Sequence, residues 1–121
     1  MIKLVYLLAK RQDVSLQDFY TYWRETHSKN VKARQKALRM KKYIQSYTVE
    51  PELNDLLRES RGLEPPYPGV TEVWWESAAD LKAALATPEG AAAMQFLIDD
   101  ESRFIDFSHT RVFMTEENTI F

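Results

Sequence analysis

The order of strand and helix patterns along this chain leaves few folds open to it. Four segments have the apolar runs or the two-residue alternation of β-strands, and helical patterns or turn residues separate them. We expect strands at residues 2–9, 40–50, 70–76 and 108–115. All four carry apolar or aromatic side chains on both faces. A sheet built from them therefore needs cover on both sides.

Residues 15–31, between the first two strands, predict an amphipathic helix. At about 100° per residue, its apolar side chains and one histidine fall in a single stripe. The stripe contains Leu16, Phe19, Tyr20, Trp23 and His27, with Val31 at its edge. Ser15 is a suitable N-cap. Residues 29–39 favour a second helical segment through their Ala and Lys content.

The second half of the chain predicts three more helical segments. A short helix is expected to start at Pro51 and to end before Gly62. The prolines of residues 63–69 then indicate a surface loop, either a plain connector or a mobile lid. Ser77 is expected to cap another helix. Thr87 and Pro88 begin the last one, whose apolar stripe runs to Ile105.

This β-α-β-β-α-β order with an inserted helix is typical of a ferredoxin-like α+β fold with an antiparallel sheet. The 121 residues suit one domain, spanning residues 1–121. Helices cover only one face of such a sheet. We therefore expect the second face to pack against another copy of the chain, as a homodimer.

Composition argues against several classes of function. The net charge is −2, from 16 basic and 18 acidic side chains with no basic run, so nucleic acid is not an expected partner. There is no cysteine, and the two histidines are far apart, so no metal site is expected. No glycine-rich nucleotide loop appears, and no cofactor is expected. The N-terminal segment is too short and too soon charged for a signal peptide or membrane span, which predicts a cytoplasmic protein with no membrane contact.

Several stretches together resemble the EthD-like family of the dimeric α/β barrel superfamily. They are YLLAKRQDVSLQDFYTYWRETHSKNV, YIQSYTVEPELNDLLRESRG, VTEVWWESAADLKAALATPEG and DDESRFIDFSHTRVFMTEE. The more specific parts are F-x-x-Y-W-x-x-x-H from Phe19 to His27 and D-E-x-x-F-I-D from Asp100 to Asp106. The resemblance implies that two sheets meet as a barrel and that each monomer holds a cavity between its sheet and its helices.

The resemblance also implies a range of activities. The family's namesake acts alongside a cytochrome P450 system in ether breakdown. Similar proteins include dehydratases and decarboxylases of aromatic polyketide pathways, and the superfamily includes cofactor-free monooxygenases, cyclases and isomerases. Many members have a histidine in the second strand, where this chain has Tyr47. A mechanism with two histidines is therefore not expected here.

His27 is the leading candidate for catalysis, because an imidazole on a buried stripe can exchange a proton near neutral pH. Its alternative role is structural, holding the helix end by a hydrogen bond. Tyr47 is a candidate to orient a substrate oxygen. The expected substrate-binding residues are Tyr6, Trp23, Tyr43 and Trp75, which are alternatively ordinary core. His109 and Arg111 are expected at the surface or at the dimer contact.

Two functions follow as hypotheses. The first is a cofactor-free enzyme for a small aromatic or polyketide-like molecule, acting as a lyase, dehydratase, cyclase or monooxygenase. His27 would be its acid/base and Tyr47 its orienting group. The second is a non-catalytic dimeric binding or accessory protein of an oxidative, P450-linked catabolic system.

Overall fold

The computed structural model describes all 121 residues and contains one four-stranded antiparallel sheet. Its strands are β1 (Ile2–Leu8), β2 (Lys42–Tyr47), β3 (Gly69–Trp75) and β4 (Arg111–Thr115), in the order β2-β3-β1-β4. The helices are α1 (Leu16–Thr21), α2 (Ser28–Ala33), α3 (Pro51–Glu59), α4 (Ala78–Leu85) and α5 (Pro88–Glu101), with a π-helix, η1 (Tyr22–His27), between α1 and α2. The predicted ferredoxin-like α+β fold is confirmed.

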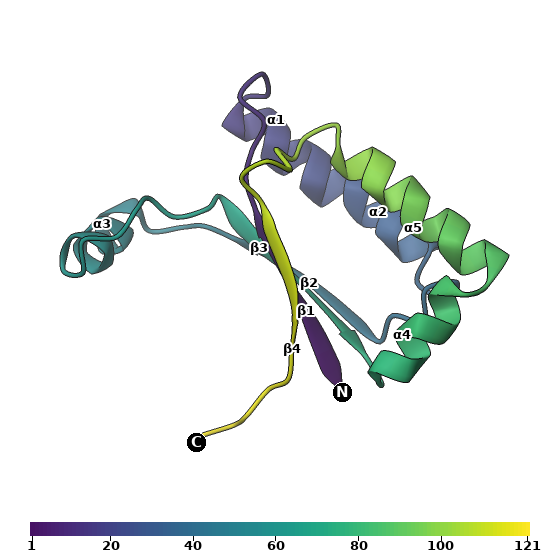
Figure 1. Cartoon of the computed structure of the whole chain (residues 1–121). Coiled ribbons are helices and arrows are strands. Elements are labelled where there is room, and N and C mark those ends of the chain that lie inside the picture. Colours follow the sequence, from purple (N-terminus) through teal and green to yellow (C-terminus); the bar gives the residue numbers. More distant parts are fainter.

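The helices α1, α2, α4 and α5 lie on one side of the sheet (Figure 1). The register pairs Leu4 with Val73 and Tyr6 with Thr71, so these side chains share the face towards the helices. We call this the inner face. Val5, Leu7 and their cross-strand neighbours lie on the opposite face, called the outer face, which no helix of this layer covers.

Capping residues start the helices where the sequence predicts them. Ser15 Oγ accepts the N–H of Asp18, and Ser77 Oγ accepts the N–H of Asp80. Thr87 does the same for α5, whose first residue is Pro88. These bonds satisfy N–H groups that have no partner within the helix. The last helix, predicted to carry its apolar stripe to Ile105, ends at Glu101, and Ile105 forms a bridge with Lys10. Four further features differ from the prediction.

The second and fourth strands are shorter than predicted. β2 ends at Tyr47 because its partner β3 begins at Gly69, directly after a proline that has no N–H for a ladder. β4 begins at Arg111 rather than at Ser108. The Asp106 carboxylate holds the preceding residues in a turn by accepting the backbone N–H and the hydroxyl of Ser108.

The helical predictions in the first half also need correction. α2 ends at Ala33, and turns follow until Arg39, which adopts a positive φ of 56°. The predicted second helical segment over residues 29–39 is therefore cut short. Leu16, in the first turn of α1, is 52% exposed and does not belong to the buried stripe. Phe19, Trp23, His27 and Val31 of the predicted stripe are buried, and Tyr20 is half-buried against Phe19 and Trp23.

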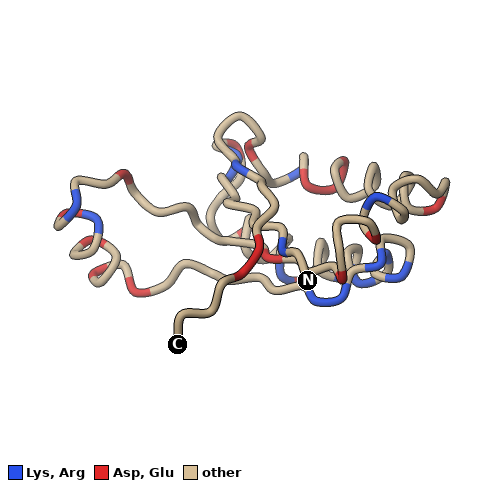
Figure 2. Tube along the Cα trace, turned by 60° about the horizontal axis from the view of Figure 1, so that its bottom comes forward, with Lys and Arg blue, Asp and Glu red and all other residues tan.

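The segment that carries α3 projects away from the rest of the molecule as an arm (Figure 1). No residue of α3 is buried, and Leu53, Leu56 and Leu57 are 47–65% exposed. Acidic and basic residues occur on both the arm and the helical layer, and neither carries one sign alone (Figure 2). None of the helices has the length and hydropathy that crossing a membrane requires.

Candidate functional site

A cavity of about 280 Å³ lies between the inner face of the sheet and the helices. Eighteen residues line it, and fifteen of these are hydrophobic. The other three are His27, Thr71 and Glu101. Ile98 on α5 and Val112 on β4 also line the cavity and are 41% and 55% exposed, so it approaches the surface between these two elements. Mostly apolar walls with a few polar groups are typical of small-molecule sites.

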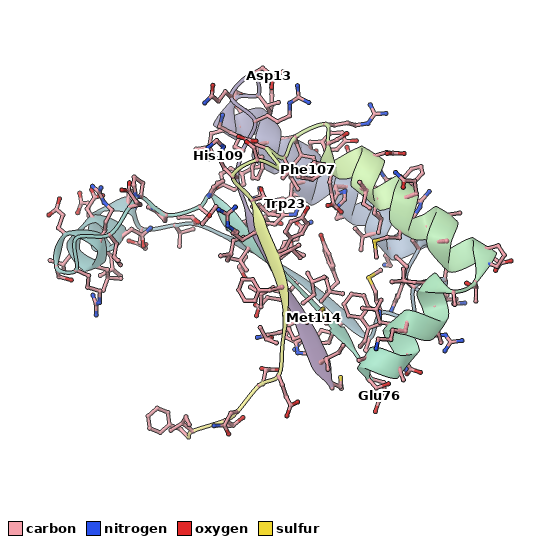
Figure 3. All side chains as sticks on the ribbon, in the orientation of Figure 1. Asp13, Trp23, Glu76, Phe107, His109 and Met114 are labelled. Atoms are coloured by element: carbon pink, nitrogen blue, oxygen red, sulfur yellow. The ribbon has the colours of Figure 1, made fainter.

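Five of the six predicted site residues come together at this cavity. They are His27, Tyr6, Trp23, Tyr43 and Trp75. Figure 3 shows Trp23 between the sheet and the helical layer. Tyr47 is not among the lining residues. Its ring packs edge-on against Trp23 at 5.0 Å between centroids, and its hydroxyl donates to Gln45 Oε1 at 2.6 Å.

The π-helix η1 explains how His27 is aimed. In an α-helix, residues five apart, such as Tyr22 and His27, lie about 140° apart. A π-helix instead bonds residue i to residue i+5, which brings both side chains to nearly the same face. The carbonyl of Trp23 accepts the N–H of Ser28 in this pattern and also accepts Gln45 Nε2 at 2.9 Å. A side chain of β2 thus supports the irregular turn.

Tyr22 and His27 converge on Asp100, near the end of α5. His27 Nδ1 lies 2.6 Å from Asp100 Oδ2, and the Tyr22 hydroxyl donates to Oδ1. Asn30 Nδ2 donates to Oδ2 at 2.9 Å. Burial alone would raise the pKa of Asp100, but these three hydrogen bonds outweigh it and hold the pKa below its usual value. Asp100 is therefore an ionised carboxylate held by three donors.

His27 is the neutral partner in this pair. Burial lowers its pKa below the ordinary value, against the opposing hydrogen bond and charge of Asp100. A neutral imidazole beside a carboxylate carries its proton on Nδ1, which leaves Nε2 as an acceptor. Nε2 has no partner within the chain, and no fully buried side-chain nitrogen or oxygen lacks one. Nε2 is thus the nitrogen that His27 presents to the cavity.

Glu101 adds an acidic group to the same cavity. The Tyr6 hydroxyl donates to Glu101 Oε1 at 2.7 Å, joining β1 to the end of α5. Burial, with a smaller contribution from the charge of Asp100, raises the pKa of Glu101 to about 7. The carboxyl group is therefore close to half-protonated at neutral pH. The cavity therefore holds a base, His27, whose pKa is lowered by burial, and an acid, Glu101, whose pKa is raised by burial.

The sequence patterns did not identify Glu101 or Asp100 as site residues. The signal for Glu101 is its spacing, because it continues the apolar stripe of Met94, Leu97 and Ile98 at helical intervals. Asp100 has no such local signal, since its partner His27 lies 73 positions away. The side chain of His109 is 72% exposed, and its Nδ1 lies 2.8 Å from Asp106 Oδ2. His109 does not line the cavity.

Comparison with known proteins places this geometry in a family context. The model of the EthD domain family matches residues 11–108. A search of curated proteins finds no match. Among solved structures, 36 chains match.

Three of these structures illustrate the range of the similarity. An EthD family protein from Bacillus halodurans is 20% identical, with 98% of this chain and 99% of that chain covered and a TM-score of 0.64. An EthD-like protein from Ralstonia eutropha is 16% identical, with 95% and 89% covered and a TM-score of 0.63. A dimeric protein of unknown function with a ferredoxin-like fold from Bacteroides fragilis is 13% identical, with 96% and 95% covered and a TM-score of 0.59. At these identities the similarity shows a shared fold.

Proposed function

The chain belongs to the EthD domain family, and from this premise we propose that it is a homodimeric, cofactor-free enzyme that transforms a small, flat, apolar molecule by acid/base catalysis. One observation carries the proposal. A neutral histidine, fixed by a buried carboxylate, presents its free nitrogen to an apolar cavity. The whole of residues 1–121 acts as a single domain in this account.

The catalytic step follows from the His27–Asp100 pair. Nε2 of His27 takes a proton from an acidic carbon or a hydroxyl of the substrate, and the ring becomes an imidazolium. The Asp100 carboxylate keeps the ring oriented through Nδ1 and stabilises the positive charge that forms. The same proton then returns to another atom of the substrate or to a leaving hydroxyl. Isomerisation, cyclisation and dehydration all fit this balance.

The aromatic walls supply substrate recognition. Trp23, Tyr43 and Trp75 provide ring surfaces against which a flat aromatic or polyketide-like molecule packs. Tyr47, which the sequence suggests as the orienting group, contacts Trp23 instead of lining the cavity. We assign it the role of supporting the Trp23 wall.

The outer face of the sheet supports the homodimer. Its strands present apolar side chains that the helical layer of the same chain does not cover, namely Val5, Leu7, Ile44, Val70, Trp74 and Phe113. The Bacteroides fragilis relative with the same fold is described as dimeric. Two sheets that pack through these faces form the barrel that the family resemblance implies.

A turnover screen with matched histidine variants tests the catalytic proposal. Flat phenols and cyclic ketones of the aromatic polyketide type are incubated with the unmodified protein, the His27→Gln variant and the His109→Gln variant. We expect turnover that falls at least about 100-fold in His27→Gln, the usual scale for loss of a general base. The exposed His109→Gln change is expected to leave the rate unchanged. Binding without turnover, together with an inert His27→Gln change, would favour the non-catalytic accessory protein.

A further inference from the structure

The cavity lining contains an acidic side chain and no Lys or Arg. The acidic side chain is that of Glu101, one of the eighteen lining residues. Asp100, the next residue along α5, is ionised and buried beside it. Arg103, whose side chain is 71% exposed, lies with Nε 3.9 Å from Asp100 Oδ1 and does not line the cavity. An anionic ligand in this cavity would therefore meet the Glu101 carboxyl group and no cation in the lining. Burying an unpaired charge in such surroundings is strongly unfavourable.

Glu101 is held so that one of its oxygens remains available. Tyr6 occupies Oε1, and burial raises the Tyr6 pKa so that its hydroxyl keeps its proton and stays a donor. Oε2 makes no hydrogen bond within the chain, and no fully buried side-chain oxygen lacks a partner. Oε2 is therefore the oxygen that Glu101 offers to a ligand.

We propose that Glu101, positioned by Tyr6, binds the oxygen atom of an uncharged ligand that carries a hydroxyl or carbonyl group, and that the cavity discriminates against carboxylates. The proposal rests on the proposed function, because it defines the ligand class of the same cavity. Ionised Glu101 accepts a hydrogen bond from a hydroxyl, and protonated Glu101 donates one to a carbonyl. A pKa of about 7 makes both forms available at neutral pH.

The test uses three ligands of matched shape: 2-naphthol, 2-naphthoate and 2-methylnaphthalene. Binding is followed by NMR of methionine methyl groups labelled with carbon-13. Met40 and Met94 line the cavity and report occupation, whereas Met1 and Met114 lie outside it and serve as internal controls. We expect 2-naphthol to bind at least about tenfold more tightly than either of the other two, as a hydrogen bond to a charged group implies.

In the Glu101→Gln variant we expect the ratio of the dissociation constant of 2-naphthoate to that of 2-naphthol to fall at least about tenfold, because the repelling charge is gone. Glu89→Gln, an exposed change at the start of the same helix, should leave all three affinities unchanged. The ligand series on the unmodified protein is decisive even where the variant does not fold. Equal affinities for the three ligands, or an unaltered ratio in Glu101→Gln, would overturn the assignment.

The results also separate this inference from the proposed function. Equal binding of 2-naphthol and 2-methylnaphthalene, with shifts at Met40 and Met94, would refute the Glu101 subsite and leave the ligand cavity intact. If none of the three compounds shifts these two methyl groups, both the subsite and the proposed ligand cavity are wrong.

Discussion

His27 and Glu101 are displaced from their ordinary pKa values in opposite directions by the same cause. Burial disfavours charge, so it lowers the pKa of the imidazole and raises the pKa of the carboxyl group to about 7. Near neutral pH one group is ready to accept a proton and the other is partly able to donate one. Pairs of groups with such displaced pKa values are typical of acid/base sites.

The raised pKa of Glu101 predicts a pH-dependent cost in stability. The group's pKa is about 7 in the folded protein, against an ordinary value of 4.5 for a glutamate in the unfolded chain. Its favourable contribution is therefore fully present below about pH 4.5 and is lost as the pH rises through 7. The unfolding free energy of Glu101→Gln should equal that of the unmodified protein at pH about 4. At pH about 8 it should be higher by up to about 3 kcal/mol, because the unmodified protein then keeps a buried charge. Urea unfolding across this range, with Glu89→Gln as control, measures the difference; a constant offset at every pH would contradict it.

Asp100→Asn tests the orienting role of the carboxylate. The change removes a charged acceptor that serves His27, Tyr22 and Asn30. We expect a loss of about 1.5–3 kcal/mol in unfolding free energy, the scale for a hydrogen bond to a charged group. Nitrogen-15 NMR should also show that the Nδ1–H tautomer of His27 is no longer the only form. Retention of that tautomer would show that Asp100 does not orient the ring.

These residues show how far sequence pattern reaches. The burial of His27 could be predicted because it shares a helical stripe with Phe19 and Trp23. Its pairing with Asp100 could not, because the contact joins two helices across the fold. Tyr47 lies on the inner face of β2 with Tyr43, but a periodic pattern does not tell a cavity wall from the layer of side chains behind it.

At the scale of elements, the π-helix is the feature that periodicity misses. A plot at about 100° per residue assumes one helical geometry throughout, so it separates Tyr22 from the stripe that holds His27. The element order and the three capping residues were predictable because they depend on local chemistry. The ends of β2 and β4 were not, since the pairing of distant strands and a side-chain turn determine them.

Gly69 is the strand position that admits the Trp23 ring. A Cβ atom there would lie 2.5 Å from two carbons of that ring and 2.9 Å from the Ser46 carbonyl oxygen. We expect Gly69→Ala to lower the unfolding free energy by about 1–3 kcal/mol, the scale of overpacking, and to displace this wall of the cavity.

Gly62→Ala is the matched control, measured like Gly69→Ala by urea unfolding followed with far-ultraviolet circular dichroism. Gly62 has a φ of +63° and no neighbouring atom within 4 Å of the added methyl group. Its cost of about 1 kcal/mol should be purely conformational and should leave ligand binding intact. A Gly69→Ala variant as stable as the unmodified protein, with equal affinity for 2-naphthol, would show that Gly69 does not position the Trp23 wall.

At the scale of the whole molecule, the two faces of the sheet have different roles. The inner face and its helices enclose the cavity, while the outer face and the leucines of α3 remain without cover within one chain. Contiguous exposed apolar surface on a folded chain usually marks a site of association with another protein surface. The β-α-β-β-α-β pattern predicted this division, because helices in such a fold cover only one side.

Phe113→Asp tests the outer-face dimer. Phe113 lies on the outer face of β4, opposite Val5, and is 49% exposed in the single chain. A carboxylate buried against the apolar face of a second copy should raise the dimer dissociation constant at least about 100-fold. Sedimentation equilibrium at micromolar concentration measures this, with the exposed Leu85→Asp change on the helical side as control. A monomeric unmodified protein, or a Phe113→Asp dimer of unaltered affinity, would argue against this interface.

The most direct test of the central claim is a nitrogen-15 NMR titration of the His27 imidazole, with and without 2-naphthol. We expect an Nδ1–H tautomer, a pKa below the ordinary histidine value of 6.5, and a shift of the Nε2 signal alone when the ligand is added. A pKa above 6.5, a proton on Nε2, or an Nε2 signal that ignores the ligand would contradict the assignment of His27 as the base of this cavity.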